Sequence, residues 1–541
     1  MRVFETSAVH VSRIRKLTRK RAAWACGLLW LGAGLTSGVP AHSQSWEKAP
    51  PLPTDMRNLL STISQGSNLY LIYEQYRENR DGLQKAAERI SLAEAIARGL
   101  ATSPLLARTV AEIQASEWTG VAIQREWVPS LSVRTSNPGV LGYTTSSTSL
   151  KTKTPGSDES EVLKFENGFR SNPYAELSWA FFDPSRPSRQ SAQGSRIEAL
   201  RNRLNFTTRE LILAIQTAYT TLQEDLEREK DLIELFNQSI AIYVGAHKSQ
   251  RPPGEISRLE AQAVSLLIAR INAHKESIQA MDALASLINL EPGKLALPSE
   301  MAGVIPIWPL SRGDSIQQAL AQREELRANA LDIRALMSDA RAIRRKVLPA
   351  LALSGQVQRN NLTQQGGSFT DNLPGSLTRT TGYTTFLGLT FDWKVFDGGI
   401  RNAEANAIDA KTRQAQAQGD LNRLTVTREV TDAYAGFVAS KILVDAARAD
   451  VDASRRSLQA AISSYERGLH NDEGTTVVQA ILKLQTALNT YRNLLAGQNT
   501  SIYQLYRSTA TWPSETESLV RAQYQRWLAP PVAQPLPALK P

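Results

Sequence analysis

The chain has 541 residues, of which 42% are hydrophobic and only 7% aromatic, and its formal net charge at pH 7 is +10. The low aromatic content, with recurring Ala, Leu, Gln, Arg and Thr, favours long helices over a compact sandwich. Residues 1–43 hold seven Lys or Arg against one Glu, so the remainder carries only about +4. This weak excess does not indicate a nucleic-acid partner.

Residues 1–43 have the pattern of a secretory signal peptide. Six Lys or Arg between positions 13 and 21 precede an apolar stretch at 22–35, and small residues suited to cleavage follow at 39–43. The apolar stretch is short for a membrane-spanning helix, which needs about 20 residues; an uncleaved anchor is the alternative. Cleavage removes Cys26, the single cysteine, which excludes disulfides and a thiol active site from the mature chain.

After a polar lead-in that predicts one helix over 55–77, the chain shows the same order of features twice. Ser91 and Ser315 are each expected to cap a short helix. Longer helices are predicted over 104–126 and 325–346. The resulting divisions are a signal peptide at 1–43, an N-terminal extension at 44–90, a first repeat at 91–290, a linker at 291–313, a second repeat at 314–510 and a Pro-rich, loosely ordered tail at 511–541.

Each repeat then predicts two strands separated by a polar loop. The first strands begin at Val128 and Leu348, each followed by a proline, which a strand accepts at its first position. Polar loops rich in Gly, Ser and Thr are expected at 143–170 and 361–381. In the returning strand at 387–395 apolar and polar residues alternate, so one face is apolar and the other polar. This pattern fits the wall of a membrane β-barrel, and an edge strand of a soluble sandwich is the alternative.

Both returning strands end in a similar strand-to-helix motif. Phe182 and Phe396 each precede an aspartate, and the two phenylalanines are 214 residues apart. The residues singled out at these junctions are Phe182 and Asp183 in the first repeat and Trp393, Phe396, Asp397, Gly398 and Gly399 in the second.

Proline-free runs at 190–246 and 402–467 follow the junctions and predict two very long helices. At 1.5 Å per residue the second run extends on the order of 100 Å. Elements of this length must pack against other long helices, in a tube or bundle. Each run turns and returns, with predicted turns at 245–254 and 468–474 and returning helices at 255–290 and 475–508.

Four strands per chain cannot close a sheet in a bilayer, where every backbone group needs a partner. The mature chain has no apolar window of 18 residues or more, so strands must supply any membrane-spanning part. Known membrane barrels have at least about 8 strands. At four strands per chain, two copies supply about 8 strands and three copies supply about 12. Strand counting leaves both open, and polar strand faces with Glu176, Asp392 and Lys394 favour the wider, water-filled assembly.

These features together resemble the TolC-like outer membrane efflux proteins over residues 88–510. The resemblance rests on the duplicated order of elements, on the Trp-x-x-Phe-Asp-Gly-Gly motif at 393–399, and on Tyr465-x-x-Gly468 before the second turn. It implies an α+β membrane protein in which each chain gives four antiparallel strands to a shared transmembrane barrel and very long helices to a periplasmic helical barrel. It also implies a homotrimeric, passive exit duct of a tripartite efflux or type I secretion system, gated at its periplasmic tip.

The resemblance further implies three partners: a periplasmic adaptor protein, an inner membrane transporter and outer membrane lipid. Members of the family often place aspartates on the helix after the second turn, where this chain has Gln479 and Leu482. An acidic constriction is therefore either displaced to Asp472 and Glu473 or absent. The residues expected at the tip, as an adaptor contact or gate, are Gly254, Glu255, Ser257, Arg467, Gly468, Asp472, Glu473 and Gln479.

Chemical motifs are absent from the sequence. It has no phosphate-binding glycine loop, nucleophile elbow or paired-carboxylate cleft, so we assign no catalytic, cofactor-binding or metal-binding residue and expect no enzymatic activity. His247 and His470 lie near the turns, but without ligand spacing they are expected to be solvated. Lys and Arg on the long helices are expected to form solvated faces. The alternative function is a periplasmic structural or tethering protein without a pore.

Overall fold

The computed structural model describes residues 54–63, 69–135, 140–152, 155–156, 160–303, 305, 307–368, 376–468 and 474–527. The predicted signal peptide and the tail beyond residue 527 lie outside this part of the chain. All described residues fall within one unit, Pro50–Pro541.

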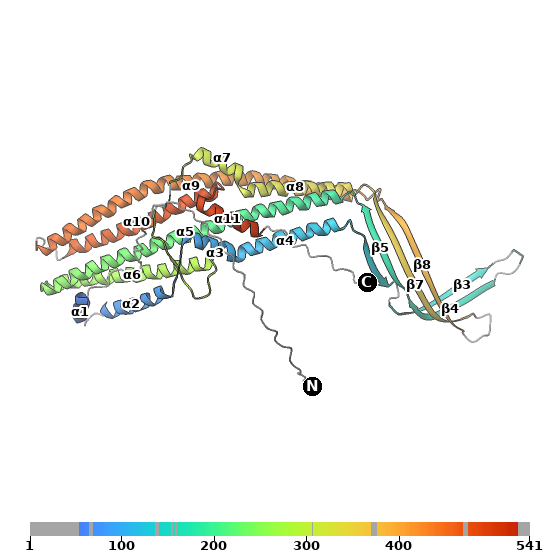
Figure 1. The fold of residues 1–541 in the computed structure, drawn as a ribbon, viewed down its shortest axis with the longest axis horizontal. Coiled ribbons are helices and arrows are strands. Elements are labelled where there is room, and N and C mark those ends of the chain that lie inside the picture. Colours follow the sequence, from blue (N-terminus) through green and yellow to red (C-terminus); the bar gives the residue numbers. More distant parts are fainter. Residues whose placement is uncertain are drawn as a thin grey trace, which may run out of the picture. The chain divides into compact units, whose positions relative to one another are not determined.

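Four long helices form two antiparallel hairpins (Figure 1). The first consists of α5 (Arg186–Lys248) and α6 (Pro253–Leu287), and the second of α9 (Ile400–Glu466) and α10 (Thr475–Ser508). These bounds confirm the predicted pairs to within four residues at each end. With 67 residues, α9 extends on the order of 100 Å.

The two hairpins pack on each other through α5 and α10. One apolar cluster joins all four helices, and its members include Phe236, Leu266, Leu458 and Ile481, none more than 4% exposed. Burying each such side chain contributes about 1.5–3 kcal/mol. Because helices draw most of their stability from an amphipathic face rather than from propensity, this shared cluster holds the hairpins side by side.

Shorter helices precede each hairpin: α3 (Leu92–Thr102), α4 (Pro104–Arg125), α7 (Arg312–Gln322) and α8 (Glu324–Arg345). Ser91 caps α3 through a capping box with Glu94, as predicted. The predicted cap at Ser315 is wrong. Ser311 caps α7 by accepting from the Asp314 amide, while Ser315 is buried inside α7 and accepts a hydrogen bond from Trp308 Nε1 at 3.1 Å.

Both ends of the described chain differ from expectation. The predicted helix over 55–77 is two helices, α1 (Thr54–Ile63) and α2 (Leu69–Ala86). The tail is predicted to be loosely ordered, yet α11 (Ser514–Trp527) forms within it, and its Tyr524 hydroxyl lies 3.3 Å from that of Thr208 on α5. A small parallel sheet joins β1 (Glu88–Ile90) to β6 (Ala296–Pro298).

The main sheet is antiparallel and has six described strands instead of the expected four. Its strands are β2 (Ser130–Thr135), β3 (Gly142–Thr152), β4 (Ser160–Ser171), β5 (Pro173–Phe182), β7 (Ala350–Ser368) and β8 (Ser376–Asp392). The expected loops at 143–170 and 361–381 are therefore largely strand. Thr-rich segments fit a pleated sheet, and the partner strands satisfy their backbone groups even though no apolar alternation marks them.

The strands β4 and β5 both pair with the same edge of β7, each with a different part of it. β5 pairs with Leu351–Gln358 of β7 and β4 with Asn361–Ser368, while β8 covers the other edge. On the far side of these two strands, β2 pairs with β5, and β3 pairs with β4. The six strands thus occupy four positions across the sheet.

The sheet has an apolar face and a polar face, as the alternation predicts. Leu131 lies opposite Leu177, Trp179 opposite Leu353, and Leu353 opposite Leu389, so one apolar band crosses all four positions. Much of it is uncovered: Leu389 is 73% exposed. On the other face Glu176 lies opposite Ser132 and Gln356, and Arg134 approaches Glu176 at 3.7 Å.

Candidate functional site

Two regions hold the sequence-predicted site residues: the strand-to-helix junctions, and the turns at the other end of the long helices. In the second junction, Gly398 and Gly399 have positive φ angles of 69° and 85°, a conformation open to glycine at little cost. They turn the chain so that Asp397 accepts hydrogen bonds from the amides of Gly399 at 3.0 Å and Arg401 at 3.2 Å. Asp397 thereby starts α9.

Arg401 completes this junction. Its guanidinium pairs with Asp397 and donates to the carbonyl oxygens of Lys346 and Lys394. The hydrogen bonds from Arg401 lower the pKa of Asp397. Trp393 Nε1 donates to the Val347 carbonyl oxygen at 2.9 Å. The junction therefore joins the end of β8, the start of β7 and the start of α9. Phe396 does not take part, because it is 84% exposed.

The first junction repeats these bonds with other residues. Asp183 accepts from the Ser185 amide at 2.8 Å and from Arg189 at 2.9 Å. Burial raises the pKa of Asp183, but the hydrogen bonds from Ser185 and Arg189 outweigh it, so the pKa is lowered. Arg186 donates to the carbonyl oxygens of Ala180 at 2.8 Å and of Glu126 at 3.3 Å. Sequence reasoning found both aspartates but not the arginines of the first junction, which lie three and six residues beyond Asp183.

Between the two junctions lies a cavity of about 330 Å³. Asp183 and Asp397 both line it, together with Lys346, Lys394 and Asp392. The structure thus brings the predicted junction residues of both repeats to one place, with charges of both signs around it.

At the far end of the helices the two predicted turns meet. Glu255, in the first turn of α6, is only 3% exposed, and the Tyr465 hydroxyl at the end of α9 donates to its carboxylate. Arg251 donates to the Tyr465 carbonyl oxygen at 3.2 Å and lies 4.9 Å from the centre of the Tyr465 ring. Burial, with Glu255 adding to it, raises the pKa of Tyr465.

Gly474 packs into the same contact. Its φ is +78°, and a Cβ placed there lies 3.5 Å from Glu255 Cγ. Arg258 Nη1 donates to Thr475 Oγ1 at 3.1 Å. Tyr465, Arg251 and Gly474 were not among the predicted tip residues, although Tyr465 belongs to a motif the sequence displays.

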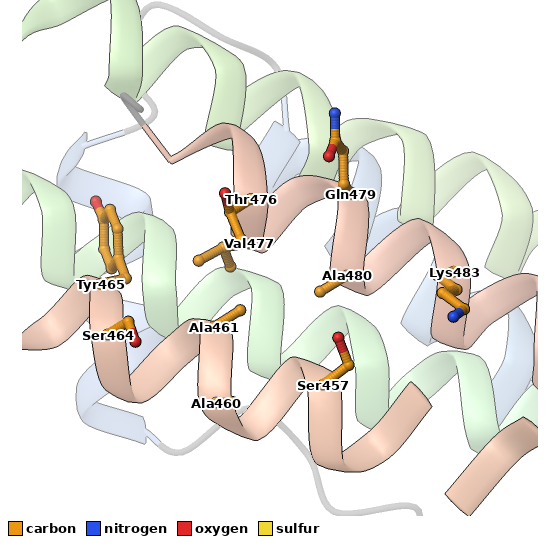
Figure 2. A pocket seen from close by; sticks show the side chains of 10 residues that line it. All are labelled: Ser457, Ala460, Ala461, Ser464, Tyr465, Thr476, Val477, Gln479, Ala480 and Lys483. Carbon is orange, nitrogen blue, oxygen red and sulfur yellow. The ribbon is translucent and has the colours of Figure 1, made fainter. Parts of the chain in front are cut away.

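The remaining predicted tip residues are exposed or undescribed. Gly254, Ser257, Arg467 and Gly468 are exposed, and Gly468 has a φ of +67°. Asp472 and Glu473 lie outside the described residues, so their predicted role stays a prediction. Gln479 lines a groove of about 410 Å³ between α9 and α10, shown in Figure 2 with Ser457, Ser464, Tyr465 and Lys483.

A buried charge cluster links the two helical hairpins farther from the turns. Arg492 of α10 pairs with three acids of α5, approaching Asp231 at 2.8 Å, Glu227 at 3.4 Å and Glu224 at 3.5 Å. Burial raises the pKa of Glu224 to about 7; Arg492 opposes this shift, while Glu227 and Asp231 add to it. Arg492 therefore departs from the expectation that Lys and Arg on the long helices form solvated faces.

The described residues contain neither a metal-site cluster nor a bilayer-spanning helix. No cluster of three or more His, Cys, Asp or Glu side chains has the arrangement of a metal site among them. Within the same residues, no helix combines the length and hydropathy needed to cross a bilayer.

Part of the chain matches a known family of proteins. Residues 315–511 match the family model described as outer membrane efflux protein. No curated protein sequence matches the chain.

Solved structures match over most of the chain. The outer-membrane channel OprN matches with a TM-score of 0.59 and 17% identity, covering 78% of this chain and 90% of its own. The Campylobacter jejuni outer membrane channel CmeC has a TM-score of 0.59 and 15% identity, with coverage of 80% and 89%. The open state of the Neisseria gonorrhoeae outer membrane channel MtrE has a TM-score of 0.56 and 16% identity, with coverage of 78% and 89%. Residues 315–511 are therefore similar to the outer membrane efflux proteins, and the chain has the fold of these outer membrane channels.

Proposed function

We propose that the chain is the subunit of a trimeric, passive exit duct in the outer membrane, serving a tripartite efflux or type I secretion system. The observation that carries this proposal is the two-faced sheet. Its apolar band is exposed at Leu131 on β2 and at Leu389 on β8, and an uncovered apolar surface of this kind marks contact with a membrane or a partner.

The edges of the sheet support a closed assembly of several copies. Among the described strands, β2 pairs only with β5, and β8 only with β7, so each leaves one edge unpaired. In lipid such an edge costs several kcal/mol per backbone group, and joining β8 of one copy to β2 of the next removes the cost. Four positions per chain give about 12 for three copies, enough for a water-filled lumen. The polar face with Glu176 and Arg134 then lines the lumen.

We further propose that residues 91–290 and 314–510 are two structural repeats, flanked by the extension 44–90, the linker 291–313 and the tail. The matched bonds of Asp183 and Asp397 support this division, because corresponding residues make them in both halves. A signal peptide at 1–43 is part of the same proposal, since the chain must leave the cytoplasm to reach an outer membrane.

The turns form the periplasmic tip in this proposal. The contact between Glu255 and Tyr465 joins the two hairpins of one chain at that tip, and separating them widens the opening. One of the similar structures is of a channel in an open state, so the fold is compatible with such a change. The exposed Gly254, Ser257, Arg467, Gly468 and Gln479 are available to a periplasmic adaptor, which connects the duct to an inner membrane transporter. No step of this function needs an enzyme, a cofactor or a metal.

Cell fractionation and heat-modifiable gel migration test the proposal. A passive duct is expected in the outer membrane fraction, as a trimer that dissociates only on heating, and to conduct ions in planar bilayers. Recovery as a soluble periplasmic monomer contradicts it and favours the tethering protein. An adaptor and a transporter are expected to copurify with the tagged, natively expressed channel.

A further inference from the structure

The apolar face of the sheet has two aromatic edges. Along β8 this face runs from Trp393, at the junction with the helices, to Tyr383, ten residues earlier in the chain. At about 3.3 Å per residue and a tilt of about 40°, this length rises about 25 Å, the height of the apolar band in outer-membrane barrels. Tyr383, which is 70% exposed, therefore marks the edge of the band that lies far from the helices.

Beyond this edge the same face becomes polar and positively charged. On β7 it presents apolar residues or glycine from Leu351 to Val357, and then Arg359, its first charged residue. β7 and β8 run side by side here (Figure 1). Their next three cross-strand pairs are Arg359 opposite Tyr383, Asn361 opposite Thr381, and Thr363 opposite Arg379. We name these six residues the rim patch.

The two arginines of the rim patch are exposed. Arg359 Nε donates to Asn361 Oδ1 at 3.2 Å, and its guanidinium carbon lies 5.8 Å from the centre of the Tyr383 ring. These two contacts hold the guanidinium on the surface of the sheet. Its Nη1 and Nη2 groups are therefore presented at the edge of the apolar band.

The neighbouring strands offer the arginines no carboxylate. The one acidic residue of β7 and β8 is Asp392, at the end of β8 beside the helices. β3 has none, and in the assembly proposed above β3 of the next copy adjoins this part of β8. The positive charge of Arg359 and Arg379 is therefore left for an anion from outside the sheet.

The spacing of the two arginines indicates what kind of anion fits. Arg359 and Arg379 stand at opposite corners of the rim patch, about 13 Å apart along the strands and one strand, about 4.8 Å, across. Asn361 and Thr381 lie between them with an amide and a hydroxyl. Arginine forks match phosphate groups. The patch thus fits a molecule with a phosphate at each end and sugar hydroxyls between them.

We propose that the rim patch binds a phosphorylated glycolipid of the outer leaflet, with one phosphate at Arg359 and another at Arg379. Its acyl chains then lie along the apolar band, which is continuous with the patch, so charge and apolar contact act on the same molecule. Two exposed rings extend the patch: Phe169 lies opposite Thr363, and Tyr143 lies opposite Phe169 with centroids 5.3 Å apart. This inference rests on the proposed function, because it needs the apolar band to lie in a membrane.

Native mass spectrometry of the full-length channel in detergent tests the site. The probes are a disaccharide glycolipid with two phosphates and the same lipid after both phosphates are removed. The wild type is expected to bind the phosphorylated lipid at least about tenfold more tightly, because the other form lacks the charge-assisted hydrogen bonds. Arg359→Gln with Arg379→Gln is expected to abolish this preference. A wild type without the preference, or a double variant that keeps it, overturns the proposal.

Arg170→Gln is the matched control. Arg170 follows Phe169 on β4, so it lies at the same height, but the alternation of the strand places it on the polar face. This variant is expected to keep the preference of the wild type, and its loss there would assign the effect to added charge anywhere on the sheet. Arg359→Lys with Arg379→Lys keeps both charges and is expected to bind the phosphorylated lipid more tightly than the glutamine variant does.

Inorganic phosphate separates a lipid site from a general anion site. An excess of it is expected to leave glycolipid binding unchanged, because free phosphate has no acyl chains to place on the apolar band. Full competition assigns the patch to free anions and overturns the lipid assignment. Membrane fractionation and heat-modifiable migration are scored separately for each variant. A soluble monomer contradicts the duct itself, whereas an outer membrane trimer without phosphate preference contradicts the rim patch alone.

Discussion

The indole nitrogen of Trp393 donates a hydrogen bond to the backbone carbonyl of Val347 at 2.9 Å, which ties the end of β8 to the start of β7. In the first half of the chain Trp179 makes the same bond to Trp127 at 2.7 Å. Each indole thus secures a strand pair where it meets the helices.

Trp393→Phe is expected to lower the stability of the proposed trimer by about 1 kcal/mol, because phenylalanine keeps an aromatic ring but loses this hydrogen bond. The temperature at which the trimer dissociates on a gel measures the effect. Trp118→Phe, on the exposed side of α4, is the control and is expected to change that temperature little. Equal effects of the two substitutions would show that the bond to Val347 is unimportant.

Tyr465→Phe removes the hydroxyl that reaches Glu255. Glu255 is buried at this contact, so losing one donor costs about 1 kcal/mol and raises the open population of the tip about fivefold. Single-channel recording in planar bilayers is expected to show more time at high conductance. Ser464→Ala, which removes a hydroxyl from the neighbouring residue in the groove of Figure 2, is expected to behave as the wild type. An unchanged record for Tyr465→Phe would remove the contact from the gate.

Gln479→Asp with Leu482→Asp is expected to create a cation-sensitive constriction, because three copies in the proposed trimer place six carboxylates at the tip. Mg²⁺ is expected to block this variant at a concentration at least about tenfold lower than the wild type. Ser457→Asp, across the groove on α9, controls for added charge alone. If substitution of Asp472 and Glu473 by amides leaves the cation sensitivity of the wild-type current unchanged, the displaced acidic ring is excluded.

Glu224 makes stability depend on pH. Burial raises its pKa in the folded chain to about 7, above the value of an unfolded Glu near 4.5. A carboxyl with a raised pKa binds its proton more tightly when folded, so its stabilisation is full below about pH 4.5 and is lost as the pH rises through about 7.

The wild type is therefore expected to gain up to about 3 kcal/mol from this group between pH 8 and pH 5. Thermal unfolding across this range measures the slope, and Glu224→Gln is expected to flatten it. Glu276→Gln is the control, since Glu276 pairs with Arg228 at the surface and is 50% exposed. A slope that persists in Glu224→Gln assigns the pH dependence to other groups.

Gly474→Ala and Gly497→Ala are expected to have opposite effects. Gly474 has a φ of +78°, where a Cβ costs about 1–2 kcal/mol, so the alanine lowers the unfolding temperature. Gly497 lies inside α10 with nothing within 4 Å of a Cβ, and alanine there favours the helix by about 0.5–1 kcal/mol. Destabilisation by both would mean that the backbone at Gly474 is not the cause.

The features that the sequence predicts well are those with a local cause. The long helices follow from runs without proline, and their ends from turns such as Gly468, whose φ is positive. The two faces of β8 follow from alternation, and Asp397 from its place before two glycines. The capping pattern of Ser311 and Asp314 is equally local, and overlooking it led to the wrong cap at Ser315.

Features that depend on distant parts of the chain were not predictable in this way. β3 and β4 have no apolar alternation, and β4 is defined by its pairing with β7 nearly 200 residues later. Arg270 and Arg492 resemble any surface arginine in a long helix until α2 covers the first and α5 the second. Tyr465 becomes part of the tip only because Glu255, 210 residues earlier, lies against it.

β7 has one edge on β4 and β5 and the other on β8. A ribosome delivers residues 160–182 long before residues 350–368, so for that interval the earlier strands have a bare edge that attracts any extended chain nearby. We therefore expect this edge to need shielding in the nascent chain. A fragment ending before residue 350 is accordingly expected to aggregate more than one that reaches residue 392, in which β7 and β8 cover the edges of β4 and β5.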